Sequence, residues 1–248
     1  MLREKAPQIF YTYEWALAVQ RAYAHSLHPL VFFGYDDRES LQAVVALAED
    51  ETQVSFLCAN TGDYCDFIGA EGQRLDFISG VFAQLRKEGL DRITLTNIPA
   101  DSSTLSALRD VSAQIGYHVY QRTAYECAQV CVDPLRAHSG KNKHPLPGAK
   151  RLRRSSNALE REERAVSFDH LRNWNVVEHS LSKFMQAHIA RFLLTGRISN
   201  LARRERQIFL HELARLLCEK GSLTLSRMTA GNRVLAWNYG FAFEGTWF

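Results

Sequence analysis

The sequence contains no long hydrophobic run. No stretch approaches the roughly 18 apolar residues that a membrane-spanning helix needs. The first residues, Met1 to Lys5, are not followed by an apolar segment resembling a signal peptide. We therefore expect no membrane span and a cytoplasmic location.

Cysteines are few and odd in number. The five are Cys58, Cys65, Cys127, Cys131 and Cys218, spread over predicted strands and helices. A scattered, odd set argues against a disulfide framework. Cys127 and Cys131 would share one strand face, but no second pair of Cys or His lies nearby at ligand spacing, and structural zinc needs four ligands. We expect buried thiols and no metal.

Several catalytic motifs are also missing. His211-Glu212 lacks the second histidine of the His-Glu-x-x-His zinc motif. His188 falls on the apolar side of its predicted helix, which is typical of a structural histidine. No Gly-x-Ser-x-Gly or Gly-Lys-Ser/Thr sequence occurs. These absences argue against zinc hydrolases, serine hydrolases and P-loop enzymes.

What the chain does contain is an ordinary globular composition with one concentration of positive charge. Its 248 residues, 46% hydrophobic and 23% charged, suffice for one large domain or two small ones. The net charge is +3, yet residues 141–164 carry eight Lys or Arg and three Glu, a local +5 that leaves −2 for the rest. Gly and Pro open this segment, which predicts a linker that continues into a basic helix from about Ala149.

The residues before this linker predict a mixed layer of helices and strands. Apolar residues recur at helical spacing in three stretches and alternate in others. Helices are expected at 12–25, 74–87 and 103–115, and strands at 30–35, 41–48, 53–58, 91–98 and 117–132. Their order is typical of a mixed α/β layer and not of a Rossmann repeat.

The residues after the linker predict a second, similar block. Strands are expected at 165–168, 222–228 and 233–244, with a new strand from Thr246, and helices at 174–194 and 202–220. This matches the opening of the helix-then-meander pattern of the first block. We therefore expect domains at 1–133 and 165–248, joined by a basic linker and helix at 134–164.

The chain ends on Thr246-Trp247-Phe248, within what resembles the start of a strand. An aromatic strand without a partner would leave apolar area and backbone groups unsatisfied. We therefore expect the chain to be a fragment whose second domain is truncated.

Four segments, taken in order along the chain, resemble a known family. They are Phe10-Tyr11-Thr12-Tyr13-Glu14-Trp15; Asp63-Tyr64-Cys65-Asp66-Phe67; Lys150-Arg151-Leu152-Arg153-Arg154 with Leu159-Glu160; and Gly221-Ser222-Leu223-Thr224-Leu225 with Asn232-Arg233-Val234-Leu235-Ala236-Trp237. This order resembles the tandem acyltransferase-like proteins of the GNAT superfamily, in particular the FemAB-like, CelD-like group associated with cellulose and exopolysaccharide biosynthesis. The resemblance implies an α/β protein of the α+β type, with two GNAT-like folds of mixed, mostly antiparallel sheets flanked by helices, the second copy incomplete.

The same resemblance implies an acyltransferase whose co-substrate is acetyl-CoA or another acyl-CoA, with no metal and with a saccharide or amine as acceptor. In such enzymes an amine or hydroxyl attacks the thioester directly. The CoA pyrophosphate binds backbone N–H groups where a helix follows the splayed strand. In the second domain that strand would begin at Thr246. The first half of such tandem proteins has often lost cofactor binding and serves as a scaffold.

Two groups of residues are candidates for the acceptor site. Asp63, Tyr64 and Asp66 lie beside a predicted strand end, where they would orient a sugar hydroxyl or amine, or one aspartate would act as a base. The alternative is that they only cap backbone donors at a turn. Asn238 and Tyr239 lie in the strand that would border the acceptor. Apolar residues alternate along this strand, which favours a core position for the ring of Tyr239 and a polar contact for Asn238 on the opposite face.

The cations of the basic helix, Lys150, Arg151, Arg153 and Arg154, are candidates for binding CoA phosphates or an anionic glycan. The alternative for them is a solvated helix face. No residue is assigned as catalytic.

Two rival functions stay open. Clustered cations can bind nucleic acid through its phosphates, but the net acidic remainder of the chain shows no recognised binding module, so the sequence does not favour nucleic acid as a partner. The other rival is a non-catalytic GNAT-like protein that assists a polysaccharide synthase by contact.

Overall fold

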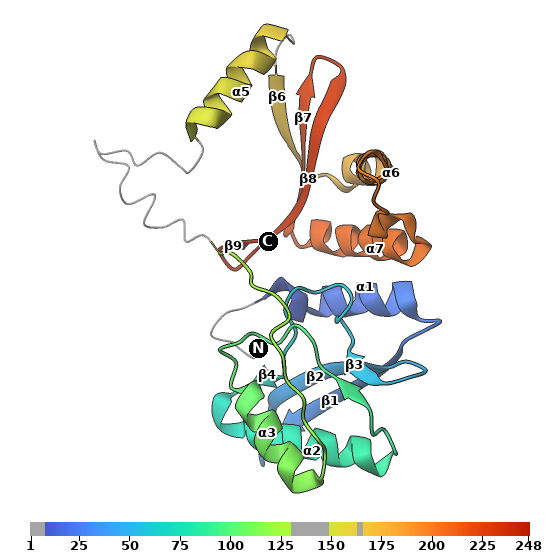
Figure 1. The fold of residues 1–248 in the computed structure, drawn as a ribbon, viewed down its shortest axis with the longest axis vertical. Coiled ribbons are helices and arrows are strands. Elements are labelled where there is room, and N and C mark those ends of the chain that lie inside the picture. The colour runs from blue at the N-terminus through green and yellow to red at the C-terminus, as the bar shows by residue number, and fades with distance from the viewer. Residues whose placement is uncertain (1–7, 130–148, 163–165) are drawn as a thin grey trace, which may run out of the picture. The chain divides into compact units, whose positions relative to one another are not determined.

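The computed structural model describes residues 8–129, 149–162 and 166–248, and it confirms a mixed α/β fold with two sheets flanked by helices (Figure 1). The chain divides into two compact units. Unit 1 comprises residues 1–122, 172–223 and 240–248, and unit 2 comprises residues 123–171 and 224–239. The domain boundaries expected from the sequence stay a prediction.

The first sheet belongs to unit 1. Its strands follow the order β1-β2-β3-β5, and β4 pairs with β2. The strand β1 runs antiparallel to β2 from His28 opposite Glu49 to Tyr35 opposite Leu41, whereas β3 and β5 are parallel. The elements are η1 (Ile9–Tyr11), α1 (Tyr13–Tyr23), β1 (His28–Tyr35), β2 (Leu41–Glu49), β3 (Val54–Phe56), β4 (Ile68–Gly69), η2 (Glu71–Gln73), α2 (Arg74–Lys87), β5 (Ile93–Thr94) and α3 (Thr104–Ile115).

The second sheet follows the order β6-β7-β8-β9, and its pairs β6–β7 and β8–β9 are antiparallel. A strand, two helices and then three consecutive strands follow one another along the chain, as expected. The elements are α5 (Ala149–Glu162), β6 (Val166–Leu171), α6 (Trp174–Leu194), η3 (Asn200–Ala202), α7 (Arg204–Glu219), β7 (Leu223–Ala230), β8 (Arg233–Phe243) and β9 (Thr246–Trp247).

One expected strand is wrong. Residues 117–129 form no strand, and nearly all of them are exposed. Their sequence pattern suits a strand, but alternation alone does not supply the neighbouring strand with which the backbone groups of a strand must pair. Cys127 is accordingly exposed rather than buried; residues 130–132, with Cys131, lie outside the described residues. The strand expected at 91–98 shortens to Ile93–Thr94.

Helices cover both faces of the first sheet (Figure 1). On one face, a Cβ atom at Gly34 would lie 2.9 Å from the ring of Phe77 in α2, so this strand and this helix are in close contact. Ala43 pairs with Gly34 and lies on this same face. Ala46 follows three residues later in β2, so its side chain points to the other face, where it lines a small pocket together with Phe10 and Ala16. The sheet is therefore a middle layer between α2 and the segment formed by η1 and α1.

Trp15 lies at the centre of an aromatic cluster in unit 1. It is 2% exposed, and its ring contacts Phe10 at 4.7 Å, Phe241 at 5.3 Å and Phe209 at 5.6 Å between centroids. The indole N–H donates to Thr61 Oγ1 at 3.0 Å. These partners come from η1, α7 and β8, so one side chain joins segments more than 200 residues apart in the sequence.

The packing of α1 against α7 is supported by two ion pairs at its edges. Arg21 Nη1 lies 2.8 Å from Glu212 Oε2, and Lys220 Nζ lies 3.4 Å from Glu14 Oε1. Both cations are well exposed, so each pair is worth less than about 1 kcal/mol. The apolar contact carries most of the stability, and the charges fix the alignment.

The sequence suggested that the last strand lacks a partner, but β9 pairs with β8. Phe248 and Phe241 exchange two backbone hydrogen bonds of 2.9 Å, and the Phe248 ring contacts Phe10 at 5.4 Å. The turn at Glu244-Gly245 has positive φ at both residues, 47° and 78°, which is the conformation of a two-residue hairpin turn. Trp247 remains 64% exposed.

Among the described residues, no helix combines the length and the apolar character needed to cross a bilayer.

The cluster around Trp15 predicts a large effect of its removal. Trp15→Ala should lower the free energy of unfolding by about 3–5 kcal/mol, because a buried indole is replaced by a cavity. Urea denaturation followed by circular dichroism measures this. Tyr13→Ala is the matched control, since Tyr13 is 73% exposed in the same helix, and should change stability by less than about 0.5 kcal/mol. A loss below about 1 kcal/mol for Trp15→Ala would contradict the central role of this residue.

Two glycines should respond to alanine with opposite signs. A Cβ atom at Gly69 would lie 2.9 Å from both the Cβ of Ala43 and the carbonyl oxygen of Gln42, so Gly69→Ala should destabilise the protein by about 1–3 kcal/mol. Gly80 lies within α2 with open space around it, so Gly80→Ala should stabilise by about 0.5–1 kcal/mol. The same denaturation experiment tests both, and a Gly69→Ala variant at least as stable as the wild type would refute the close contact of β4 with β2.

Candidate active site

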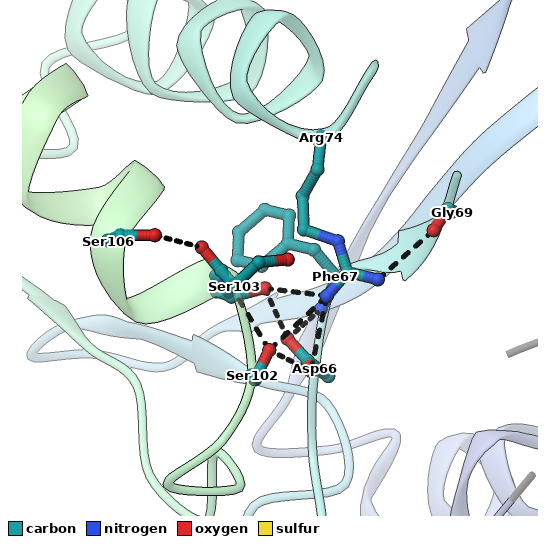
Figure 2. Close-up of polar contacts among 8 residues, drawn as sticks. Asp66, Phe67, Gly69, Arg74, Ser102, Ser103 and Ser106 are labelled. Carbon is teal, nitrogen blue, oxygen red and sulfur yellow. Dashed lines mark hydrogen bonds and ion pairs between the residues drawn. The ribbon is translucent and has the colours of Figure 1, made fainter. Parts of the chain in front are cut away.

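Asp66 is the centre of a polar network that joins three segments of unit 1 (Figure 2). Its Oδ1 accepts hydrogen bonds from the Phe67 N–H at 2.8 Å and from Thr104 Oγ1 at 2.5 Å, and its Oδ2 accepts from Ser102 Oγ at 2.6 Å. Arg74 Nη1 lies 3.6 Å from the same Oδ2, and both charged side chains are only 7% exposed.

The guanidinium of Arg74 extends this network. It donates to Ser102 at 3.2 Å, to Thr104 at 3.3 Å and to the Gly69 carbonyl at 3.0 Å. The start of α2 is thereby tied both to β4 and to the start of α3. A buried charge pair needs such additional hydrogen bonds to offset its desolvation.

These contacts occupy both carboxylate oxygens of Asp66, which limits what the residue can do for a ligand. The geometry favours the capping interpretation for this residue over that of a base. The other two candidates lie close by: Asp63 is exposed, and the half-buried ring of Tyr64 contacts Phe10 at 6.0 Å. The substrate-binding role of the three stays a prediction.

A small pocket lies beside these residues. Its volume is about 50 Å³, and Tyr64, Cys65 and Asp66 contribute to its wall together with Phe10 and Thr12. This space suits one or two water molecules. It is far below the roughly 300–1,000 Å³ typical of pockets that hold organic ligands. As it stands, the pocket does not admit a saccharide.

The two buried thiols near this pocket are poor nucleophiles. Burial raises the pKa of Cys58 to about 12. It also raises the pKa of Cys65 far above its usual range, with further contributions from Cys58, Asp66 and Asp63. The thiolate is the reactive form of cysteine. Neither side chain therefore supports a covalent acyl-cysteine intermediate at neutral pH.

Asn238 and Tyr239 lie in the part of β8 that belongs to unit 2. Leu235, Trp237 and Tyr239 are half-buried, while the alternate residues are exposed, which confirms the expected faces of this strand. Burial raises the pKa of the Tyr239 phenol. The hydroxyl therefore stays protonated at neutral pH and can donate a hydrogen bond. Asn238 presents its amide to solvent.

The four cations expected to bind anions lie on α5 in unit 2, and all are exposed: Lys150, Arg151, Arg153 and Arg154. Spacings of three and four residues place Arg154 next to both Arg151 and Lys150 on the helix surface. No carboxylate of the described residues lies within ion-pair distance of any of the four. Their role in binding phosphate groups stays a prediction.

His188 has a structural environment, as its position on the apolar side suggested. Its Nδ1 lies 2.8 Å from Ser199 Oγ, and its ring stacks on Phe192 at 4.6 Å. Ser199 Oγ also accepts from the Leu201 N–H at 3.0 Å. Desolvation, with a smaller contribution from Arg191, lowers the pKa of His188. The imidazole is therefore neutral at pH 7 and joins α6 to η3.

Sequence reasoning missed a larger pocket in unit 1. Its volume is about 590 Å³. Its wall contains two arginines, one histidine and one glutamate among hydroxyl and amide side chains, and the residues are Tyr23, His25, Ser26, Asn60, Ile198, Ser199, Asn200, Arg203, Glu205 and Arg206. Burial raises the pKa of the Tyr23 phenol, so it remains a donor. The only sequence signal was the run Arg203-Arg204-Glu205-Arg206, which lies at the start of a helix far from the other lining residues.

The second block of the chain, together with α5, matches a known family model. The family model described as an acetyltransferase (GNAT) domain matches residues 148–248. This region contains α5, β6, α6, α7, β7, β8 and β9. The match supports acyl-CoA-dependent acyl transfer in general and confirms the expected GNAT-type domain in this block. No curated protein matched the chain.

The GNAT match supports the expected co-substrate in general, because GNAT domains use acyl-CoA as the acyl donor. Within the ranges that the structure describes, no group of three or more His, Cys, Asp or Glu side chains is arranged to hold a metal ion.

The Asp66 network yields a stability prediction. Asp66→Asn leaves Arg74 buried without its counter-charge and should lower the free energy of unfolding by about 3–5 kcal/mol. The exposed neighbour provides the control: Asp63→Asn should cost less than about 1 kcal/mol. Urea denaturation of both variants measures the difference.

A double variant separates the charge effect from a loss of packing. Replacing both partners, Asp66→Asn with Arg74→Met, should be less destabilising than Asp66→Asn alone, because no uncompensated charge is then left in the interior. If the double variant is as unstable as the sum of its single changes, the ion pair is not what organises this site.

Proposed function

We propose that this protein is an acyl-CoA-dependent acyltransferase, specifically an acetyltransferase, that modifies an amine or hydroxyl of a polysaccharide, a sugar or a related precursor. The observation that carries the proposal is the GNAT-domain match over residues 148–248, where a strand, two helices and consecutive antiparallel strands follow each other. The order of the four segments described from the sequence supports the finer placement in the FemAB-like, CelD-like group.

The proposed reaction is a direct transfer. The acceptor nitrogen or oxygen forms a bond to the thioester carbonyl carbon, the C–S bond breaks, and the proton lost by the acceptor ends on the CoA thiol. The low reactivity of the buried thiols agrees with a route without a covalent enzyme intermediate. The chain's contribution is then to hold the two reactants in register and to stabilise the developing oxyanion.

The residues of unit 2 fit an acyl-CoA ligand chemically. The cations of α5 supply positive charge for the CoA phosphates. The Asn238 amide and the protonated Tyr239 phenol are donors on opposite faces of β8, so one of them would orient an acceptor or the thioester oxygen. Both groups of residues fall within or next to the part of the chain that matches the GNAT domain. We place the reaction in the cytoplasm, which suits the free thiols of Cys58 and Cys65.

One alternative is a non-catalytic GNAT-like protein that assists polysaccharide biosynthesis by contact. The observation that favours it is the engagement of Asp66 in structural bonds, which leaves no assigned base. Nucleic-acid binding by the basic segment is a weaker alternative, because the rest of the chain is net acidic and its sequence shows no recognised nucleic-acid-binding module.

Calorimetric titration with acetyl-CoA tests the proposal. We expect saturable binding that weakens as salt rises. Arg151→Gln with Arg154→Gln should weaken it by about three- to tenfold, since two exposed phosphate contacts are lost. Lys87→Gln with Lys183→Gln removes the same charge from exposed positions outside α5 and should have a smaller effect. Absence of any binding heat to the intact chain would count against the acyltransferase.

Turnover separates an enzyme from an accessory protein. Release of free CoA thiol in the presence of an amino sugar or a polysaccharide acceptor, measured with a thiol reagent, would support catalysis. The exposed Cys127 contributes to the background signal in this assay, and a Cys127→Ser variant removes that contribution. Saturable CoA binding without turnover on any saccharide would favour the accessory role.

A further inference from the structure

The C-terminal end of α6 is a rigid turn. The Gly196 N–H donates to the Leu193 carbonyl and the Arg197 N–H donates to the Phe192 carbonyl, both at 3.0 Å. Gly196 has a φ of 70°. This is a Schellman motif, in which an apolar residue usually packs from the position after the glycine back onto the helix. Here Arg197 takes that position, with its guanidinium 4.8 Å from the centre of the Phe192 ring.

The rigid turn holds three aliphatic side chains in solvent. Leu193 is 63% exposed, Leu194 88% and Ile198 85%. We call these three residues the apolar tip. Single exposed apolar side chains are common, but a group of neighbouring ones marks an interaction site. The hydrogen bonds of the turn define the backbone conformation from which these side chains project.

Positive charge is concentrated in the sequence on both sides of the apolar tip. Residues 188–206 contain five arginines and no lysine, with Glu205 as the only acidic residue, a net +4. Four of the arginines are exposed and form what we call the basic collar: Arg191, Arg197, Arg203 and Arg204. Arg203 and Arg204 stand at the N-terminal end of α7, where the helix dipole disfavours cations. Their placement therefore does not serve the stability of α7.

The large pocket connects the tip to the collar. Ile198 of the tip and Arg203 of the collar line the same pocket, together with Arg206 and His25. Glu205, also in the wall, lies 3.8 Å from His25. The pocket thus offers arginine donors for an anion immediately beside an exposed aliphatic side chain. This is the arrangement that an amphiphile with an anionic head group would recognise.

We propose that this face of unit 1 docks on an anionic phospholipid membrane. The apolar tip enters the acyl region, the basic collar contacts head-group phosphates, and the pocket beside Ile198 takes one head group. Neither an apolar contact nor a few cations alone holds a protein on a membrane, but the two together do so reversibly. The proposal is independent of the acyltransferase function.

The basic collar argues against two other occupants of this surface, a second copy of the chain and a purely apolar ligand. In a symmetric dimer the same patch meets itself, so the collars of two copies would face each other with like charge. An apolar ligand alone would not need the collar. A lipid surface satisfies both features, because its phosphates lie above its acyl chains.

Vesicle sedimentation tests the proposal with the whole chain. We expect binding to vesicles of phosphatidylcholine mixed with phosphatidylglycerol, weaker binding at high salt, and little binding to phosphatidylcholine alone. Leu194→Glu with Ile198→Glu should weaken binding by about tenfold or more, because two inserted side chains become charged. The matched control is Tyr120→Glu, at a residue that is 88% exposed like Leu194; it should bind like the wild type.

A charge variant tests the collar without touching the turn. Arg191→Gln with Arg204→Gln should weaken binding and reduce its salt dependence, whereas Lys87→Gln with Lys183→Gln, at exposed positions elsewhere, should change both less. Circular dichroism confirms that each variant is folded. A Leu194→Trp variant adds a direct readout: lipids with brominated acyl chains should quench its fluorescence more than that of the wild type.

Three results would overturn the proposal. The first is no sedimentation with phosphatidylglycerol vesicles. The second is equal sedimentation of the folded Leu194→Glu, Ile198→Glu variant. The third is a wild-type chain that self-associates without lipid, does not bind vesicles and becomes monomeric in that variant, which would make the tip a contact between copies.

Discussion

The packing of one indole ring determines how the segments of unit 1 come together. Trp15 is contacted by rings from η1, α7 and β8, and its only polar atom is satisfied by Thr61. An aromatic residue of this size buries enough apolar area to outweigh the surface ion pairs around it. Because its partners Phe209 and Phe241 lie near the other end of the chain, residues 172–223 and 240–248 belong to the same compact unit as the N-terminal residues. The two compact units therefore combine elements from both of the blocks that suggested a repeated fold.

The Asp66–Arg74 pair is the second organising interaction, and it decides what the first block can contribute chemically. A carboxylate held at low exposure by three hydrogen bonds and a guanidinium is fixed in place. That makes it a good anchor for the starts of α2 and α3 and a poor group to present to a substrate. The buried thiols nearby are equally inert. The chemistry of acyl transfer is therefore better sought in residues 148–248, where the GNAT domain matches.

The sequence could predict the elements that depend on local patterns, but not the features that depend on tertiary contacts. The helices Arg74–Lys87 and Trp174–Leu194 were expected with these same ends, because their apolar spacing and their flanking residues are local signals. The strand expected at 117–132 was wrong because alternation says nothing about whether a neighbouring strand exists. The partners of Asp66 lie 36 and 38 residues away in Ser102 and Thr104, and the pocket beside Ile198 joins residues still farther apart. Such sites depend on tertiary contacts that no spacing rule contains.

Positive charge is concentrated at two places with different surroundings. Residues 141–164 carry +5 and residues 188–206 carry +4, which leaves −6 for the rest of a chain of net charge +3. The described cations of the first segment lie on the polar helix α5. The second segment also contains the exposed aliphatic side chains of the apolar tip. Both would bind anions in a salt-dependent way, since salt at 0.1 M largely screens the interaction of exposed charges that are more than about 10 Å apart. Salt alone therefore cannot distinguish a phosphorylated small ligand from a lipid surface. The aliphatic contribution can, because the transfer of Leu194 and Ile198 out of water does not depend on screening.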